Sequence, residues 1–338
     1  MAPPRLSEYE IGEVLGAGTV GTIYAAVHLE TGQQFAIKKL HPSVNQDKLI
    51  RARFRREMVV LERLHHPHII RYFGGGEDNG QLFFVMELID GGTVKELLES
   101  RRRLHWVAVL EVARQLCSAI QFAHNHGVIH RDLKPSNLFV THDGEIRLGD
   151  FGIARDLENA DIGEKGTTVG TQAYMSPEQI RGDQRLSGKA DLYSLGCCLF
   201  EMCVGRPPYL AIDRVQMFEQ HLHADRPRVR DFVEDVPAEF DDLIFHLLAK
   251  GMDDRPFNAR QVQAMVLQLG ESTDPKELPE SMQLEIEANG IASCGRDLLK
   301  SQAHAWDASR SSEISWKKLV AMVAGIAALI AVASFFRN

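Results

Sequence analysis

Two hydrophobic periodicities divide this chain, and their order limits the folds that it can adopt. Between residues 9 and about 89, short β-branched or aromatic runs are separated by glycine-containing turns, which predicts strands with one helix among them (YEIGEVLG, GTIYAAVHL, QQFAIKKL, QLFFVMEL). From residue 91 to about 270, longer segments have helical spacing and end at glycines (WVAVLEVARQLCSAIQFAHNHG, DLYSLGCCLFEMCVG, ARQVQAMVLQLG). We therefore expect an α+β chain in which a small β-rich lobe precedes a larger helical lobe.

The composition is that of a globular chain. With 338 residues and 44% hydrophobic content, the chain can bury one large core or two smaller ones. The formal net charge is −8 and no extended basic tract is present, so a nucleic-acid partner is not expected. The cysteines form no CxxC pair and are odd in number, which favours reduced core thiols over disulfides or a redox sensor. They are Cys117, Cys197, Cys198, Cys203 and Cys294.

An uncharged apolar run, LVAMVAGIAALIAVASFF, occupies residues 319–336. As a helix it would be about 27 Å long, close to the roughly 30 Å hydrocarbon thickness of a bilayer. The alternative is a buried core helix, but the apolar character continues around the whole helix and no folded segment follows it. We expect a C-terminal transmembrane helix, preceded by a juxtamembrane linker of low order at residues 271–316.

The flanking charges predict the orientation of this span. Lys317 and Lys318 outnumber Arg337, which favours a single-pass membrane protein whose N-terminal domain is cytoplasmic. The N-terminus lacks the apolar core of a secretory signal. Within the span, small residues recur four apart (Ala321 and Gly325, then Ala324 and Ala328), which would let two copies pack as a homodimer.

The sequence LGAGTVGTIYAAV contains a GxGxxG pattern at Gly16, Gly18 and Gly21. Alone, this pattern is shared with dinucleotide-binding folds, in which the third glycine opens a helix. Here the third glycine opens a strand-like run, so the glycines belong to a hairpin whose backbone N–H groups can approach a triphosphate. No GxxxxGK[ST] motif is present, which excludes a P-loop.

The stretch HRDLKPSN places an acid, a lysine and an amide within six residues, between apolar runs. Such groups cost several kcal/mol to desolvate unpaired, so the cluster indicates a functional site. Lys38 lies on the strand that follows the glycine hairpin, from which its ammonium group would reach phosphates under the hairpin. Glu57, on a predicted helix, would hold Lys38 by a charge-assisted hydrogen bond.

With GAGTVGTIY, AIK, HRDLKPSN, LGDFGIAR, SPE and DLYSLG in this order, the chain resembles the protein kinase superfamily. It is most similar to the bacterial (Hanks-type) membrane-anchored serine/threonine kinases. The resemblance covers residues 9–270 and implies a bilobal protein-kinase fold, with an N-lobe at about 9–89 and a C-lobe at about 91–270. It also implies ATP and Mg²⁺ as cofactors and protein serine or threonine hydroxyls as acceptors.

The resemblance assigns roles to individual residues. Asp132 would accept or orient the substrate hydroxyl, Lys134 would neutralise charge on the γ-phosphoryl group, and Asn137 with Asp150 would hold Mg²⁺. Met86 would border the adenine, Glu87 and Ile89 would offer main-chain hydrogen bonds, and Thr171 would line the acceptor loop. The implied nucleotide site comprises Leu15, Gly16, Ala17, Gly18, Thr19, Val20, Gly21, Thr22, Ile23, Ala36, Lys38, Glu57, Met86, Glu87 and Ile89.

Regulation by autophosphorylation is a further expectation. Phosphate on Thr167 or Thr168, in GEKGTTVGT, would order the loop after Asp150 by pairing with Arg131 and Arg53. The alternative is that these threonines are ordinary loop residues.

The chain would act either as an active kinase or as a nucleotide-binding pseudokinase that serves as a membrane scaffold, and Lys38, Asp132 and Asp150 favour the kinase. The departure SPE, where the family more often has alanine first, leaves Glu178 able to pair with Arg255. The histidines of HHPH and HLH lack a clear ligand set, so a metal site there is not expected.

Overall fold

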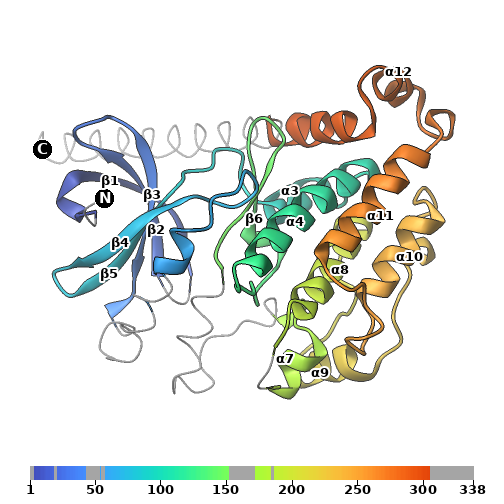
Figure 1. Cartoon of the computed structure of the whole chain (residues 1–338), viewed down its shortest axis with the longest axis horizontal. Helices are drawn as coiled ribbons and strands as arrows, with labels where there is room; N and C mark the ends of the chain where they lie inside the picture. The colour runs from blue at the N-terminus through green and yellow to red at the C-terminus, as the bar shows by residue number, and fades with distance from the viewer. Residues whose placement is uncertain are drawn as a thin grey trace, which may run out of the picture.

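A five-stranded antiparallel sheet with the strand order β1-β2-β3-β5-β4 forms the N-terminal lobe (Figure 1). The computed structural model describes residues 4–18, 21–42, 54, 58–151, 172–183 and 186–304. Alternate residues of β3 and β5 point to one face of the sheet, where Ile37 and Val85 are buried with Phe35 and Phe83. The strands are β1 (Tyr9–Ala17), β2 (Gly21–His28), β3 (Gln34–Leu40), β4 (Tyr72–Asp78) and β5 (Gln81–Met86).

Helices dominate the second lobe, as the sequence predicts, and a two-stranded hairpin lies between them and the sheet (Figure 1). The hairpin consists of β6 (Leu138–Val140) and β7 (Ile146–Leu148). The α-helices are α3 (Val94–Arg101), α4 (Trp106–Asn125), α7 (Pro177–Arg181), α8 (Lys189–Val204), α9 (Arg214–His223), α10 (Ala238–Leu247), α11 (Ala259–Ser272) and α12 (Glu280–Asn289).

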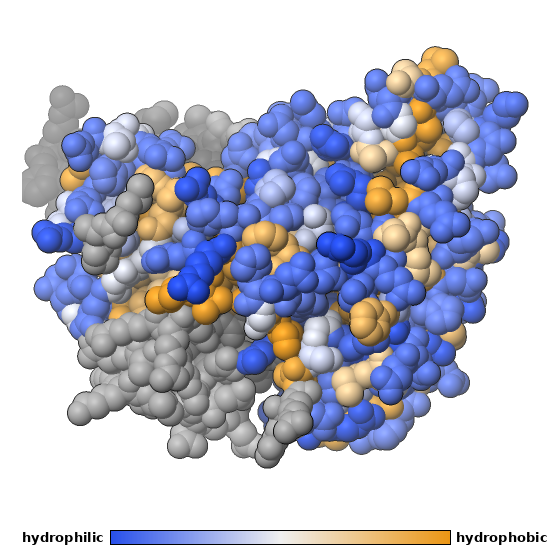
Figure 2. Space-filling view, viewed as in Figure 1, coloured by the Kyte–Doolittle hydropathy of each residue, from blue (hydrophilic) through white to orange (hydrophobic). Residues whose placement is uncertain are grey.

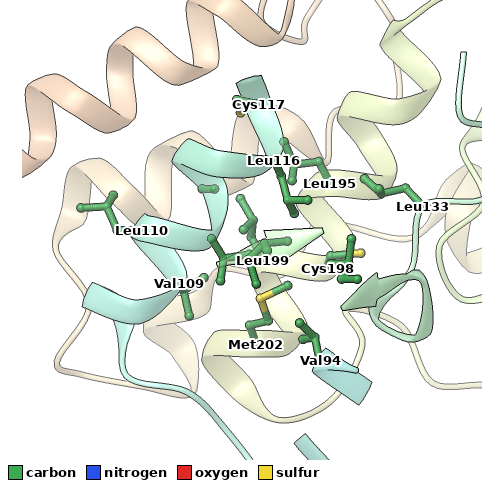
Figure 3. Packing of buried hydrophobic residues seen from close by; sticks show 14 of the residues in the cluster. Val94, Val109, Leu110, Leu116, Cys117, Leu133, Leu195, Cys198, Leu199 and Met202 are labelled. Atoms are coloured by element: carbon green, nitrogen blue, oxygen red, sulfur yellow. The ribbon is translucent and has the colours of Figure 1, made fainter. Parts of the chain in front are cut away.

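The core of the helical lobe lies between α4 and α8. Figure 3 shows Val109 and Leu116 of α4 close to Leu195 and Leu199 of α8, all in one buried cluster. Leu133 joins this cluster from the loop that contains HRDLKPSN. Each fully buried side chain of this size contributes about 1.5–3 kcal/mol of transfer free energy. The loop is therefore anchored on the buried core of the helical lobe.

The five cysteines are free and buried, which confirms that they are core residues. Burial raises the pKa of Cys117, Cys197 and Cys203 above the ordinary thiol value, so they stay protonated and unreactive near neutral pH.

The low order predicted for residues 271–316 is wrong for the part that the structure describes. Helix α12 and a second helix over residues 291–304 continue the chain, with Ile286 and Leu299 buried in the main core. Figure 2 shows apolar surface over α11 and α12, where a groove of about 460 Å³ lies between these helices and α4. Helix propensity and composition do not predict these helices, because their stability comes from packing against the C-lobe.

The predicted span at residues 319–336 lies outside the described residues. Within the residues that are described, no helix combines the length and the apolar character that crossing a bilayer requires.

Candidate active site

The loop from His130 to Asn137 connects α4 to β6 and brings its acid, lysine and amide together. Lys134 Nζ lies 2.7 Å from Asp132 Oδ2. The Asn137 side-chain nitrogen donates to the backbone oxygen of Asp132 at 2.8 Å and to its Oδ2 at 3.2 Å. A short 3-10 turn at Pro135–Asn137 makes this proximity possible, because it folds the chain back toward Asp132. The three predicted residues therefore form one cluster.

The backbone of this loop is held by Asp191, at the start of α8. Asp191 is buried and accepts hydrogen bonds from the N–H groups of His130 and Arg131, both at 2.8 Å. His124 Nε2 lies 2.7 Å from the same carboxylate. Burial by itself would raise the pKa of Asp191, but its hydrogen bond to His124 and the nearby His130 hold that pKa below the usual range.

The contact of Asp191 with this loop was not predicted from the sequence, although Asp191 lies in the motif DLYSLG. The signal was a carboxylate in a mostly apolar helix, where an unpaired buried charge would be costly. Arg131 shows what this anchor maintains, because its φ of +65° lies in the left-handed region that non-glycine residues rarely occupy. The N–H donated by Arg131 to Asp191 helps to hold that conformation.

Asp150 lies opposite this loop, at the end of the β6–β7 hairpin. Lys38 Nζ is 2.7 Å from Asp150 Oδ1, which joins two residues that are 112 positions apart in the sequence. Burial by itself would raise the pKa of Asp150. The charge of Lys38 and its hydrogen bond to the carboxylate act in the opposite direction, and the pKa lies below its usual value. The predicted partner of Lys38, Glu57, lies outside the described residues. Asp150 is therefore an ionised carboxylate that forms an ion pair with Lys38 of the N-lobe.

The two sides of the site are also linked through His130. Its Nε2 donates to the carbonyl oxygen of Gly149 at 2.9 Å, next to Asp150. The ring of His130 lies 4.7 Å from that of Phe151, which is buried. Contacts of one histidine thus connect the loop containing Asp132 with the segment containing Asp150.

The glycine hairpin has the geometry predicted from its flanking strands. Gly16 of β1 pairs with Ile23 of β2, and Ile23 pairs with Lys38 of β3. A Cβ on Gly16 would have no atom within 4 Å, whereas one on Gly21 would collide with the backbone of β3. Gly16 thus leaves room for a ligand, and Gly21 permits close strand packing. Thr19 and Val20, at the tip, lie outside the described residues.

The predicted adenine region lies where the sheet meets the helical lobe. Ala36 pairs with Met86 across β3 and β5, and both side chains are buried. The N–H of Glu87 donates to the carbonyl oxygen of Arg71 at 2.9 Å, so Glu87 would offer its carbonyl group to a ligand. Ile89 packs against the core of the helical lobe.

Asn137 and Asp150 suit Mg²⁺ as ligands. The Asn137 side-chain nitrogen is used in contacts with Asp132, so the amide oxygen is the atom that can coordinate a metal. The lowered pKa of Asp150 keeps its carboxylate ionised near neutral pH. Hard oxygen donors of this kind are those that Mg²⁺ prefers, with further positions taken by water and phosphate.

The histidines of HHPH and HLH serve structural roles where they are described. His68 Nδ1 lies 3.2 Å from the backbone oxygen of Ile146, and His221 Nδ1 lies 2.8 Å from the Tyr193 hydroxyl. Burial lowers the pKa of His66 to about 4 and that of His221 to about 3, so both are neutral near pH 7. Among the described residues, no cluster of three or more His, Cys, Asp or Glu side chains could hold a metal ion.

The ion pair expected between Glu178 and Arg255 is confirmed. The guanidinium group of Arg255 donates to both carboxylate oxygens of Glu178, at 2.7 and 2.9 Å, and both side chains are buried. Serine in place of alanine at position 176 therefore does not disturb this pair. The predicted regulatory and acceptor-loop residues Arg53, Thr167, Thr168 and Thr171 lie outside the described residues.

Comparisons with known proteins agree with this geometry. A protein-family model described as "Protein kinase domain" matches residues 9–266. Serine/threonine-protein kinase PknB of Mycolicibacterium smegmatis is 32% identical over 348 aligned positions, which cover 98% of this chain and 55% of that protein. Serine/threonine-protein kinase PknL of Mycobacterium tuberculosis is 33% identical and covers 74% of this chain and 62% of that protein.

A solved structure, the PknI kinase domain of Mycobacterium tuberculosis, superposes with a TM-score of 0.61 at 28% identity. The match covers 79% of this chain and 98% of that domain. The chain spans about half the length of the curated relatives that it matches.

Proposed function

This chain belongs to the protein kinase family, in its bacterial serine/threonine branch, and we propose that it transfers the γ-phosphoryl group of ATP to serine or threonine hydroxyls of protein substrates. The main support for this proposal is the arrangement of two clusters of polar and charged residues at one site. Asp132, Lys134 and Asn137 form one group, and Lys38 with Asp150 forms the other. Phosphoryl transfer depends mainly on positioning and charge stabilisation, which such an arrangement supplies.

Each residue has a separable task in this mechanism. Asp132 orients the acceptor hydroxyl and receives its proton, while Lys134, 2.7 Å away, places a positive charge beside the transferring group. Lys38 positions the nucleotide phosphates beneath the glycine hairpin. Asn137 and Asp150 would hold Mg²⁺, which would neutralise charge on the phosphate oxygens.

The alternative function is a pseudokinase scaffold that binds nucleotide without transferring phosphate. A kinase is favoured because Asp132, Lys38 and Asp150 are all present and Asp191 holds Asp132 in a defined loop conformation. A scaffold would not require a proton acceptor in this position.

The decisive experiment measures transfer of radiolabelled phosphate by the full chain and by Asp132→Asn. We expect the variant to lose transfer to serine or threonine while it binds ATP with nearly unchanged affinity, because Asp132 acts on the acceptor. Activity above a few per cent of the parent would contradict the role of Asp132. ATP binding by the parent chain without any transfer would instead favour the scaffold.

Two further parts of the proposal concern regulation and location. Phosphorylation at Thr167 or Thr168 would activate the kinase by pairing with Arg131 and Arg53. Residues 319–336 would anchor the chain in the bilayer with the kinase domain in the cytoplasm, and their small residues would permit pairing with a second copy. The support for both is the sequence pattern.

A further inference from the structure

Beyond the matched kinase domain, residues 291–304 form a helix that packs along α4, here called the C-terminal helix (Figure 1). Its Cys294, Leu299 and Ala303 are buried in the main core. Gly295 allows a close approach, because a Cβ there would lie 2.7 Å from the Val107 carbonyl oxygen and 2.8 Å from Glu111 Cβ. The C-terminal helix is thus an integral part of the C-lobe.

The same helix contacts the turn of the β6–β7 hairpin through its backbone. Gly144, in this turn, has a φ of +76°. A Cβ there would collide with the carbonyl oxygen of Arg296 and would lie 3.0 Å from the backbone nitrogen of Lys300. The N–H of Gly144 closes the turn by donating a hydrogen bond to the carbonyl oxygen of Thr141 at 2.9 Å. Only glycine satisfies both the left-handed backbone and the contact with the helix.

The two residues before Gly144, His142 and Asp143, also contact the C-terminal helix through their side chains. The rings of His142 and His304 are stacked, with centroids 5.0 Å apart and an interplanar angle of 14°. Lys300 Nζ lies 3.7 Å from Asp143 Oδ1. These contacts are at the surface and contribute little stability. They instead fix the position of the C-terminal helix relative to the turn.

The hairpin links this turn directly to the proposed metal ligands. β6 begins immediately after Asn137, and β7 ends two residues before Asp150. At that end the Gly149 N–H donates to the Asn137 carbonyl oxygen at 3.0 Å. The paired strands are three residues long, so the turn and the site are separated by only about 10 Å of hairpin.

The turn also contacts the segment between β5 and α3, called the hinge below, which connects the two lobes. The His142 N–H donates to Asp90 Oδ1 at 3.2 Å, and His142 Nδ1 lies 3.2 Å from Asp90 Oδ2. Asp90 directly follows Ile89, one of the predicted adenine contacts. A single turn therefore contacts the C-terminal helix on one side and the hinge on the other.

We propose that the C-terminal helix is an intramolecular positioning element, which holds the β6–β7 hairpin so that Asn137 and Asp150 are correctly placed for a Mg²⁺-bound nucleotide. Undocking of this helix would let the turn move and would weaken the binding of metal together with nucleotide. The inference rests on the proposed function, because it takes Mg²⁺ and ATP as the ligands.

The test compares two glycine substitutions in the full chain, solubilised in detergent. Gly144→Asn places a side chain against the C-terminal helix. Gly127→Asn is the matched control, because Gly127 has a φ of +74° and a Cβ there would have no atom within 4 Å. Asparagine tolerates the left-handed conformation at both positions, so the two variants differ mainly in the contact with the helix.

The readout is the Mg²⁺ concentration that gives half-maximal binding of a fluorescent ATP analogue. We expect Gly144→Asn to raise this concentration by about five- to tenfold, in the range of couplings between linked sites, and Gly127→Asn to leave it within about twofold. If the helix only stabilised the fold, Gly144→Asn would lower the unfolding temperature without changing the Mg²⁺ dependence, and Gly127→Asn would change neither.

A second pair of variants guards against local effects at the turn. Leu299→Asp should undock the C-terminal helix, and Leu299→Met, which conserves volume, should keep it docked. Hydrogen exchange would confirm undocking at residues 291–304. Loss of protection there with an unchanged Mg²⁺ dependence would overturn the inference. If the parent chain binds the Mg²⁺-bound analogue but transfers no phosphate, the proposed function fails while this coupling can still be measured.

Discussion

Asp191 accepts a hydrogen bond from the backbone N–H of His130 at 2.8 Å, although 61 residues separate them in the sequence. A carboxylate buried in α8 thereby determines the backbone path of the loop that carries Asp132. Leu133, buried beside α8 in the same loop, supplies an apolar anchor within three residues of the polar one. The loop is fixed to the core at both points, and Asp132 lies between them.

Asp191→Asn should lower kcat on the order of 100-fold, the effect expected when a catalytic group is displaced by about 1 Å. The free energy of unfolding should fall by about 1–3 kcal/mol, because a charged acceptor of two backbone hydrogen bonds is replaced by a neutral one. Steady-state kinetics and urea unfolding check both, with the exposed Asp253→Asn as control. A variant that loses stability but retains kcat would show that Asp191 only supports the fold.

The stability of the chain should decrease on acidification below about pH 6.5, the ordinary pKa of histidine. His221 has a folded-state pKa of about 3, so the unfolded state binds more protons between these values. Its contribution to stability, complete above pH 6.5, should be reduced by about 2 kcal/mol at pH 5. Urea unfolding at several pH values measures this loss. His221→Gln should make the profile less steep, with His66 accounting for part of the remaining slope, whereas His223→Gln, at an exposed position, should leave it unchanged.

Activation by loop phosphorylation predicts that the purified kinase, incubated with ATP, acquires phosphate at Thr167 or Thr168. Replacing both threonines with alanine should reduce activity several-fold, because the loop loses a doubly charged partner for arginine. Mass spectrometry locates the phosphate, and the transfer assay measures the loss. Full activity of the double variant would exclude this switch.

Membrane anchoring predicts that the full chain sediments with membranes and resists carbonate extraction. Deletion of residues 317–338 should release a soluble kinase with nearly intact activity, because these residues lie beyond the C-terminal helix. Fractionation of both forms is the measurement. Full-length protein in the soluble fraction without detergent would be evidence against an anchor.

Local patterns in the sequence were sufficient to predict most of the strands and helices. The predicted strands correspond to β1, β2, β3 and β5, and the long predicted helices correspond to α4, α8 and α11. Strand β4 was not recognised, because its centre is Gly74, Gly75 and Gly76, which give none of the β-branched or aromatic signal of a strand. The β4 strand is specified by its pairing with β5.

Residue identity alone was likewise enough to indicate the cluster of Asp132, Lys134 and Asn137, because they are close in the sequence and their types match the chemistry. The distant contacts that hold this cluster and Asp150 in place were not apparent from the sequence in this way. The ion pair of Lys38 with Asp150 and the anchoring of the loop by Asp191 join segments separated by 112 and 61 residues. No periodicity links such positions, so these contacts exist only once the tertiary structure has formed.

Residues 291–304 show most clearly that some structure depends on tertiary contacts and not on local sequence. The sequence of this segment has weak periodicity and predicted low order. Its helical structure depends on burying Leu299 and Ala303 against the C-lobe and on two glycines, Gly144 and Gly295, that admit the helix backbone. A short helix is marginal in isolation, and tertiary packing supplies the stability that its own sequence lacks. The sequence thus determined the local elements and the reactive groups, whereas the tertiary structure decided which distant residues hold those groups in place.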